Sequence, residues 1–213
     1  MFKSNKTGLA SLAATVVVVL CTLGAMVSQA GAASSSESVV SAITDWTAAS
    51  ANTATGTLLG TPVSLSGTHV WGTPQTTLDG SAPYFATSVF SPALAKSDAI
   101  QISGGPDRPF TYTIDFGAAK VTDPILEVGS LGSRIDFPAG TQVKRLSGDG
   151  TFTVSGSTVS GTATNTIGAS GLADSSGTIR LTGTFAKITF TAKTNYVGPE
   201  DGILVQLGAA LPA

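Results

Sequence analysis

The sequence predicts an all-β fold, a single antiparallel β-sandwich of jelly-roll-like form. Three observations predict it. Thr, Ser, Gly and Ala dominate the composition, while charged residues make up only 11%. Short runs of alternating apolar and polar residues recur along most of the chain, as in strands with one buried face. Glycine-containing turn signals separate these runs, a pattern typical of sandwiches and barrels rather than of βαβ folds.

The clearest strand is Phe110–Phe116. Phe110, Tyr112, Ile114 and Phe116 share one face, and Thr111, Thr113 and Asp115 share the other. The remaining predicted strands, in chain order, are Thr57–Ser66 with a break near Gly60-Thr61-Pro62, Tyr84–Phe90, Pro124–Val128, Thr141–Leu146, Thr151–Val154, Ser157–Thr162, Thr178–Leu181, Phe185–Thr191 and Ile203–Leu207. Turns are expected at Gly104-Gly105-Pro106, Ser147–Gly150, Ser155-Gly156, Ser176-Gly177 and Gly198-Pro199.

Residues 1–32 have the pattern of a secretory signal peptide. Lys3 and Lys6 precede an apolar run from Leu12 to Val27, and Ala30-Gly31-Ala32 supplies the small residues of a cleavage site. We therefore expect a secreted protein, free or associated with the cell surface, with no membrane span once the signal is removed. The alternatives are a retained anchor and lipid attachment at Cys21. Leu20 is not the small residue that lipidation normally requires.

The predicted domain boundaries follow from this leader. Residues 33–44 form a flexible or short helical lead-in, with the helical pattern at Val39–Trp46. Residues 45–208 form the sandwich, and residues 209–213 form a short tail. About 181 residues then remain, enough for one domain with a sizeable core.

Composition excludes several classes of function. Without Lys3 and Lys6, nine of the 11 basic residues face 13 acidic ones, a net charge of −4. Nucleic-acid binding requires clustered cations, and the largest cluster is the pair Lys144-Arg145. The mature chain has no cysteine, so no disulfide framework forms. No phosphate-binding or dinucleotide-binding glycine motif occurs, and we expect no organic cofactor.

Few residues suggest catalysis, and we assign no catalytic residue. His69 is the single histidine, which excludes a multi-histidine zinc site. No G-x-S-x-G element occurs in the mature chain, and we expect His69 to be structural. A glycan hydrolase with paired carboxylates remains a less favoured alternative. Its candidates are Asp98, Asp107, Asp115, Asp123, Glu127, Asp136, Glu200 and Asp201, and no spacing selects a pair among them.

Two kinds of binding site have candidate residues. Asp98, Glu200 and Asp201 flank predicted strands and carry the hard oxygen ligands that calcium prefers. The alternative is that they are ordinary turn carboxylates. Large aromatic side chains near loops or strand ends can stack on sugar rings, or they can fill the core. The aromatic candidates are Trp46, Trp71, Tyr84 and Tyr196.

The order of several segments resembles the secreted domains of the PEP-CTERM and choice-of-anchor group of bacterial surface proteins. The segments are Asp45-Trp46-Thr47, Val63–Gly67, Asp98–Gln101, Thr111–Phe116, Val121–Leu126, Gly129–Gly132, Gly177–Leu181, Gly183–Phe185 and Ile188–Phe190. The resemblance implies an extracellular β-sandwich and no catalytic residues. The chain departs from the group at Gly208–Ala213, where no sorting motif, apolar helix or basic cluster follows.

Taken together, these features predict a non-enzymatic extracellular module of the cell surface or matrix, with a structural or interaction role. Its expected partners are a cell-envelope or matrix glycan, a protein, or a second copy of the chain. The alternative is a carbohydrate- or calcium-dependent binding module.

Overall fold

The computed structural model describes residues 41–70, 89–93, 98–163, 174–197 and 199–210. The predicted signal peptide, residues 33–40 of the lead-in, Trp71, Tyr84 and residues 211–213 lie outside this part. The prediction of an all-β fold with antiparallel sheets is confirmed, because every pair of strands is antiparallel. No α-helix occurs in the described ranges, and none of them contains a helix long and apolar enough to cross a membrane.

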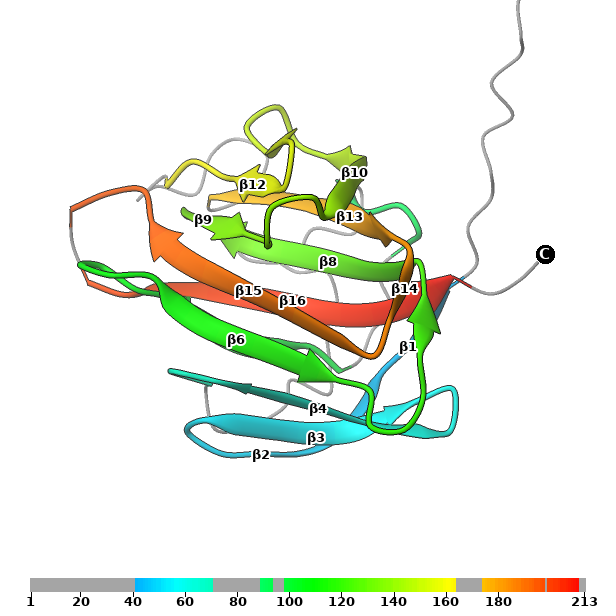
Figure 1. Ribbon diagram of the computed structural model, residues 1–213. Helices are drawn as coiled ribbons and strands as arrows, with labels where there is room; N and C mark the ends of the chain where they lie inside the picture. Colours follow the sequence, from blue (N-terminus) through cyan, green and yellow to red (C-terminus); the bar gives the residue numbers. More distant parts are fainter. Residues whose placement is uncertain (1–40, 71–88, 94–97, 164–173, 198, 211–213) are drawn as a thin grey trace, which may run out of the picture. The chain divides into compact units, whose positions relative to one another are not determined.

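One sheet has six strands, with β16 and β8 at its centre (Figure 1). Its order is β1-β16-β8-β13-β10, and β5 pairs with β16 beside β1. The strands are β1 (Ser41–Ile43), β5 (Ile100–Gly104), β8 (Pro124–Leu131), β10 (Gln142–Gly148), β13 (Ser175–Thr182) and β16 (Asp201–Ala210).

The second sheet has eight strands in the order β11-β12-β9-β15-β6-β4-β3-β2. They are β2 (Asp45–Ala49), β3 (Thr53–Leu58), β4 (Thr61–Gly67), β6 (Phe110–Asp115), β9 (Ser133–Asp136), β11 (Thr153–Ser155), β12 (Thr158–Ser160) and β15 (Lys187–Thr194). A separate two-stranded ladder joins β7 (Val121–Thr122) to β14 (Thr184–Phe185).

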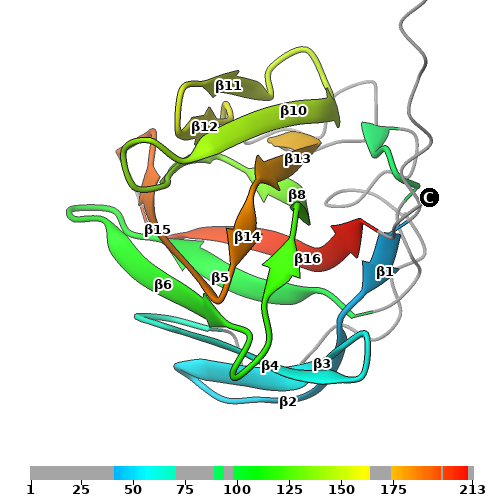
Figure 2. The ribbon, with the colours of Figure 1, turned by 45° about the vertical axis from the view of Figure 1, so that its right-hand side comes forward.

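The two large sheets enclose one hydrophobic core (Figure 2). Leu126, Val128 and Ile179 contribute to it from the six-stranded sheet. Tyr112 and Phe190 contribute from the eight-stranded sheet, and their rings stack with centroids 5.5 Å apart. The alternation in β6 places Tyr112 and Ile114 in this core and Thr111 on the outside, as the sequence predicts.

The helical prediction for Val39–Trp46 is wrong where the structure describes it. Residues 41–43 form β1 of the six-stranded sheet, and β2 then joins the eight-stranded sheet. Thr44 makes the crossing, fully buried, with its N–H donating to the Leu207 carbonyl at 2.8 Å. Strand pairing at both sheets outweighs local helical preference here. The sheets therefore extend from residue 41 to residue 210.

Two predicted turns lie inside or beside strands. Ser176-Gly177 belongs to β13, and Gly104 ends β5 while Gly105 bridges to Lys193. A Cβ atom on Gly177 would overlap the Phe152 ring, and one on Gly104 would overlap the Ser133 side chain. These glycines allow close packing rather than chain reversal. Strands β1, β2, β5, β7 and β9 were absent from the prediction. Of Tyr84–Phe90 only Val89 and Phe90 are described, outside any strand.

Candidate functional site

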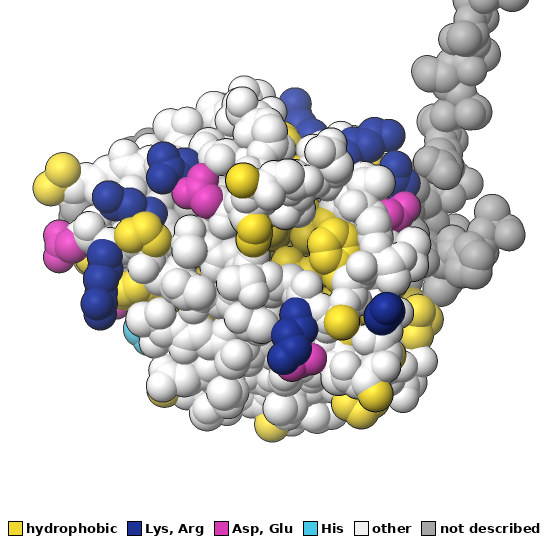
Figure 3. Space-filling view, viewed as in Figure 1, with side chains coloured by type: hydrophobic (Ala, Val, Ile, Leu, Met, Phe, Trp, Pro, Cys, Tyr) yellow, Lys and Arg dark blue, Asp and Glu magenta, His cyan; other side chains and the backbone are white. Residues whose placement is uncertain are grey.

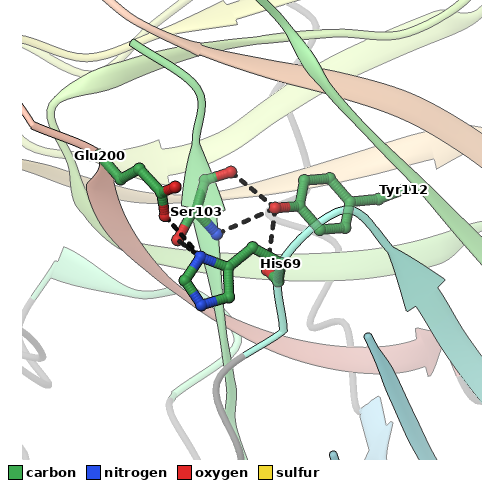
Figure 4. Close-up of polar contacts among 4 residues, drawn as sticks. All are labelled: His69, Ser103, Tyr112 and Glu200. Atoms are coloured by element: carbon green, nitrogen blue, oxygen red, sulfur yellow. Dashed lines mark hydrogen bonds and ion pairs between the residues drawn. The ribbon is translucent and has the colours of Figure 1, made fainter. Parts of the chain in front are cut away.

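His69, Ser103, Tyr112 and Glu200 form a polar cluster that joins the two sheets (Figure 4). His69 follows β4, and the bridge from Val70 to Ile102 holds its segment against β5, which carries Ser103. The sequence separates His69 from Glu200 by 131 residues, so no local pattern could have predicted this pair.

The Tyr112 hydroxyl joins the two sheets inside the cluster. It accepts a hydrogen bond from the Ser103 N–H at 3.1 Å and lies within donating distance of two carbonyls, Ser103 at 2.7 Å and His69 at 2.9 Å. Burial raises the pKa of Tyr112 to about 12. The hydroxyl therefore stays protonated at neutral pH and connects β6 to β5 and to the segment after β4.

The His69 contacts differ from those of a Ser-His-carboxylate triad. Such a triad uses opposite nitrogens of the ring for the carboxylate and the nucleophile. Here Nδ1 faces both, the Glu200 Oε2 at 2.5 Å and the Ser103 Oγ at 3.4 Å. Ser103 is also fully buried. This geometry suits a partly exposed ion pair that fastens the segment after β4 to the residue before β16.

The carboxylate of Asp201, a calcium candidate, is hydrogen-bonded to other groups of the protein. It is buried, and its Oδ2 accepts hydrogen bonds from the Gly132 N–H at 3.0 Å and the Ser133 Oγ at 2.5 Å. Burial raises the pKa of this carboxyl to about 6 and outweighs these two bonds, which lower it. Asp201 thus fastens the start of β16 to the bend between β8 and β9.

Replacing Asp201 by alanine should leave the Gly132 N–H and the Ser133 hydroxyl without their acceptor. We expect a loss of about 1–3 kcal/mol in the free energy of unfolding. Urea denaturation measures it, with Asp107→Ala as the control because Asp107 is exposed. A loss no larger than that of the control would contradict the structural role.

The predicted calcium ligands do not come together. Asp201 pairs with Gly104 at one end of β5, whereas Asp98 precedes Ile100 at the other end. The strand between Ile100 and Gly104 alone spans roughly 13 Å. Glu200 is paired with His69. The structure therefore corrects the grouping of Asp98 with Asp201, and no group of three His, Cys, Asp or Glu in the described ranges could hold a metal ion.

The aromatic candidates divide into three cases. Trp46 is only 3% exposed and belongs to the core, so of the two alternatives it fills the core rather than offering a ring to a sugar. Tyr196 is partly exposed, and its pKa is raised by burial and by the nearby carboxylates of Asp201 and Asp174. Trp71 and Tyr84 lie outside the described residues.

Glu127 is the most unusual carboxylate in the described part of the chain. It lies in β8 opposite Thr178 and Gln206, it is 1% exposed, and neither carboxylate oxygen has a hydrogen-bond partner among the described residues. Burial raises its pKa to about 8. The nearly continuous apolar run around Glu127 is typical of a central strand covered on both faces. This run was the sequence feature that could have indicated a buried carboxylate.

The outward face of the eight-stranded sheet is rich in hydroxyl groups. We call it the hydroxyl face; its members are Thr53, Thr55, Thr57, Ser64, Ser66, Thr111, Thr113, Thr153, Ser155, Thr158, Ser160, Thr189 and Thr191. They align in rows across the strands: Thr53 pairs with Ser66, Ser66 with Thr113, and Thr113 with Thr189.

Two ion pairs lie on the hydroxyl face, and Lys193, on the same side of β15 beside Arg134, adds a further cation. Lys187 contacts Asp115 at 2.7 Å, and Arg134 contacts Asp136 at 2.7 Å. Figure 3 shows the middle of this side as a broad uncharged area, with several Lys and Arg side chains gathered at its left. The face therefore offers many more hydroxyl groups than charged side chains.

Comparisons with family models, with curated proteins and with solved structures find no match for this chain.

Proposed function

We propose that this protein is a secreted, non-enzymatic module of the cell surface or matrix, a jelly-roll-like β-sandwich that contacts its partner through the hydroxyl face. The row Thr53, Ser66, Thr113 and Thr189, which crosses four adjacent strands, carries the proposal. Each hydroxyl both donates and accepts a hydrogen bond.

A hydroxyl face favours an extended partner. One hydrogen bond contributes only about 0.5–1.5 kcal/mol net, because it replaces bonds to water. Useful affinity therefore requires many contacts over a broad area, as an extended glycan or a protein strand of the cell envelope or matrix can provide. The hydroxyl groups outnumber the charged side chains on this face, so hydrogen bonds would be the main contacts with the partner that we propose.

The proposal is tested by sedimentation of the purified mature protein with the host's cell envelope and with insoluble polysaccharides. The double variant Ser66→Lys/Thr113→Lys places two cations on paired positions at the middle of the hydroxyl face. We expect at least a tenfold loss of binding, because the partner would have to desolvate both charges. The matched control is Gln142→Lys/Thr182→Lys, an exposed pair at the edge of the six-stranded sheet.

Unchanged retention of the hydroxyl-face variant, or equal losses in both double variants, would contradict this function. Self-association is followed in the same samples by analytical ultracentrifugation. Edge strand β2 is its candidate surface: it carries no Lys, Arg or Pro, and only Asp45 and the bulge between Trp46 and Ala48 protect this edge. By contrast, β10 carries Lys144 and Arg145.

A carbohydrate- or calcium-dependent module is the second candidate, and Tyr196 is the observation that favours it. It is the described aromatic candidate that is partly exposed near carboxylates. In the same assay, this function requires that Tyr196→Ala or a calcium chelator abolishes retention while the protein stays folded. Retention insensitive to both changes would exclude it.

A further inference from the structure

An apolar pocket lies at one end of the two sheets, away from the hydroxyl face. The turn between β3 and β4, the loop between β6 and β7 and the end of β16 meet there (Figure 1). Leu58, Phe116, Val121 and Ala209 provide apolar walls around a volume of about 130 Å³. A cavity on the order of 150 Å³ accepts benzene, so this pocket has room for a branched four-carbon side chain.

Leu59 stands at the rim of the pocket in an unfavourable state. It is 59% exposed, one of two large hydrophobic side chains so exposed in the described ranges. Its φ of 54° and the φ of 75° at Gly60 form the two-residue turn between β3 and β4. Such turns favour Asn-Gly, and a leucine there is both strained and exposed. A contact that covers Leu59 would compensate for this exposure.

Lys120 provides a cation at the same rim. Its side chain is exposed and makes no ion pair or hydrogen bond with the described residues. The loop that carries it is fixed in place: the Gly117 N–H donates to the Asp115 Oδ1 at 2.9 Å, and the Ala119 N–H donates to the Phe116 carbonyl at 3.2 Å. The loop backbone that carries Lys120 and the apolar walls are therefore positioned before any ligand arrives.

We propose that this pocket binds a branched aliphatic group that carries a neighbouring carboxylate, as found at the end of a peptide chain that terminates in leucine. The aliphatic group would fill the pocket and cover Leu59, while the carboxylate would pair with Lys120. Charge complementarity selects the carboxylate, and the pocket volume selects an aliphatic group of about four carbons. Capture of a chain terminus is a known mode of peptide recognition.

The probe for this site is N-acetyl-leucine, with N-acetyl-leucinamide as the uncharged comparison. Burial of one aliphatic group and one exposed ion pair supports a Kd on the order of millimolar. In a titration of the whole protein followed by NMR, we expect saturable shifts of backbone amides in 58–61 and 116–122. The acid should bind up to about fivefold more tightly than the amide.

Variants then separate the two parts of the ligand. Lys120→Met should abolish the preference for the acid, whereas the control Lys144→Met, at an exposed lysine of β10, should preserve it. Ala119→Leu should fill the pocket and weaken both probes at least tenfold. Parallel titrations with 4-methylpentanoate and with a pentapeptide ending in leucine distinguish a free aliphatic acid from a peptide terminus.

Three results would overturn the proposal. They are the absence of saturable shifts in the two segments, equal binding of acid and amide by the unmodified protein, and a preference for the acid that survives in Lys120→Met. Tighter binding of 4-methylpentanoate than of the peptide would keep the chemistry of the site but reject the peptide terminus as its source.

Discussion

Replacing Glu127 by glutamine is expected to stabilise the protein by about 2–4 kcal/mol at pH 8. The native pKa of this carboxyl is about 8, against an ordinary value of 4.5, because the side chain is buried without a hydrogen-bond partner among the described residues. The native state therefore binds the proton more tightly than the unfolded state. The stability associated with the protonated form is complete below pH 4.5 and is lost as the pH rises toward 8. Glutamine has a similar shape and carries no ionisable group.

Urea denaturation at pH 5, 7 and 8.5 measures this effect. The unmodified protein should lose stability over this range, and Glu127→Gln should lose much less. Asp201, with its pKa raised to about 6, contributes to the slope in both proteins at the acidic end. Asp107→Asn, at an exposed position, is the control and should follow the unmodified protein. Parallel pH profiles for Glu127→Gln and the unmodified protein would contradict the assignment.

Removing the Tyr112 hydroxyl should have the second large effect. Tyr112→Phe keeps the stacking on Phe190 but leaves the buried N–H and carbonyl of Ser103, and the partly buried His69 carbonyl, without their shared partner. We expect a loss of about 2–3 kcal/mol in the free energy of unfolding, the penalty for leaving buried polar groups unsatisfied.

The matched control is Tyr196→Phe, because Tyr196 is only partly buried and its hydroxyl makes no hydrogen bond with described residues. It should change stability by less than about 0.5 kcal/mol. Denaturant midpoints of both variants, measured at pH 7, make the comparison. Equal effects of the two substitutions would show that the Tyr112 hydroxyl does not link the sheets as described.

Residue patterns predicted the strands that have one buried and one exposed face. They failed for strands that are buried on both faces or that contain closely packed glycines. The alternation of β6 and β15 was readable because the hydroxyl face is exposed while the opposite face meets the core. Strand β5 was missed because four of its five residues are buried and Gly104 resembles a turn residue. Gly177 was misread for the related reason that the Phe152 ring packs against its backbone.

The site residues were harder to predict because strand register decides which side chains meet. The carboxylates Asp98 and Asp201 both flank strands, yet register places them at opposite ends of β5. Register also brings His69 to Glu200, and it hides Glu127 between Thr178 and Gln206. None of these contacts joins residues close in the sequence, so neither periodicity nor spacing could reveal them.

The pairing of β1 with β16 also has a consequence for how the chain folds. The first described strand lies against the last, and β16 occupies an inner position in its sheet. The six-stranded sheet therefore cannot be completed until nearly the whole chain is available. Contacts so distant in sequence slow folding, because a long loop must be ordered before they form. For the secreted protein that we propose, this delay would keep the chain extended while it is being translocated, and the native structure would form only on the far side of the membrane.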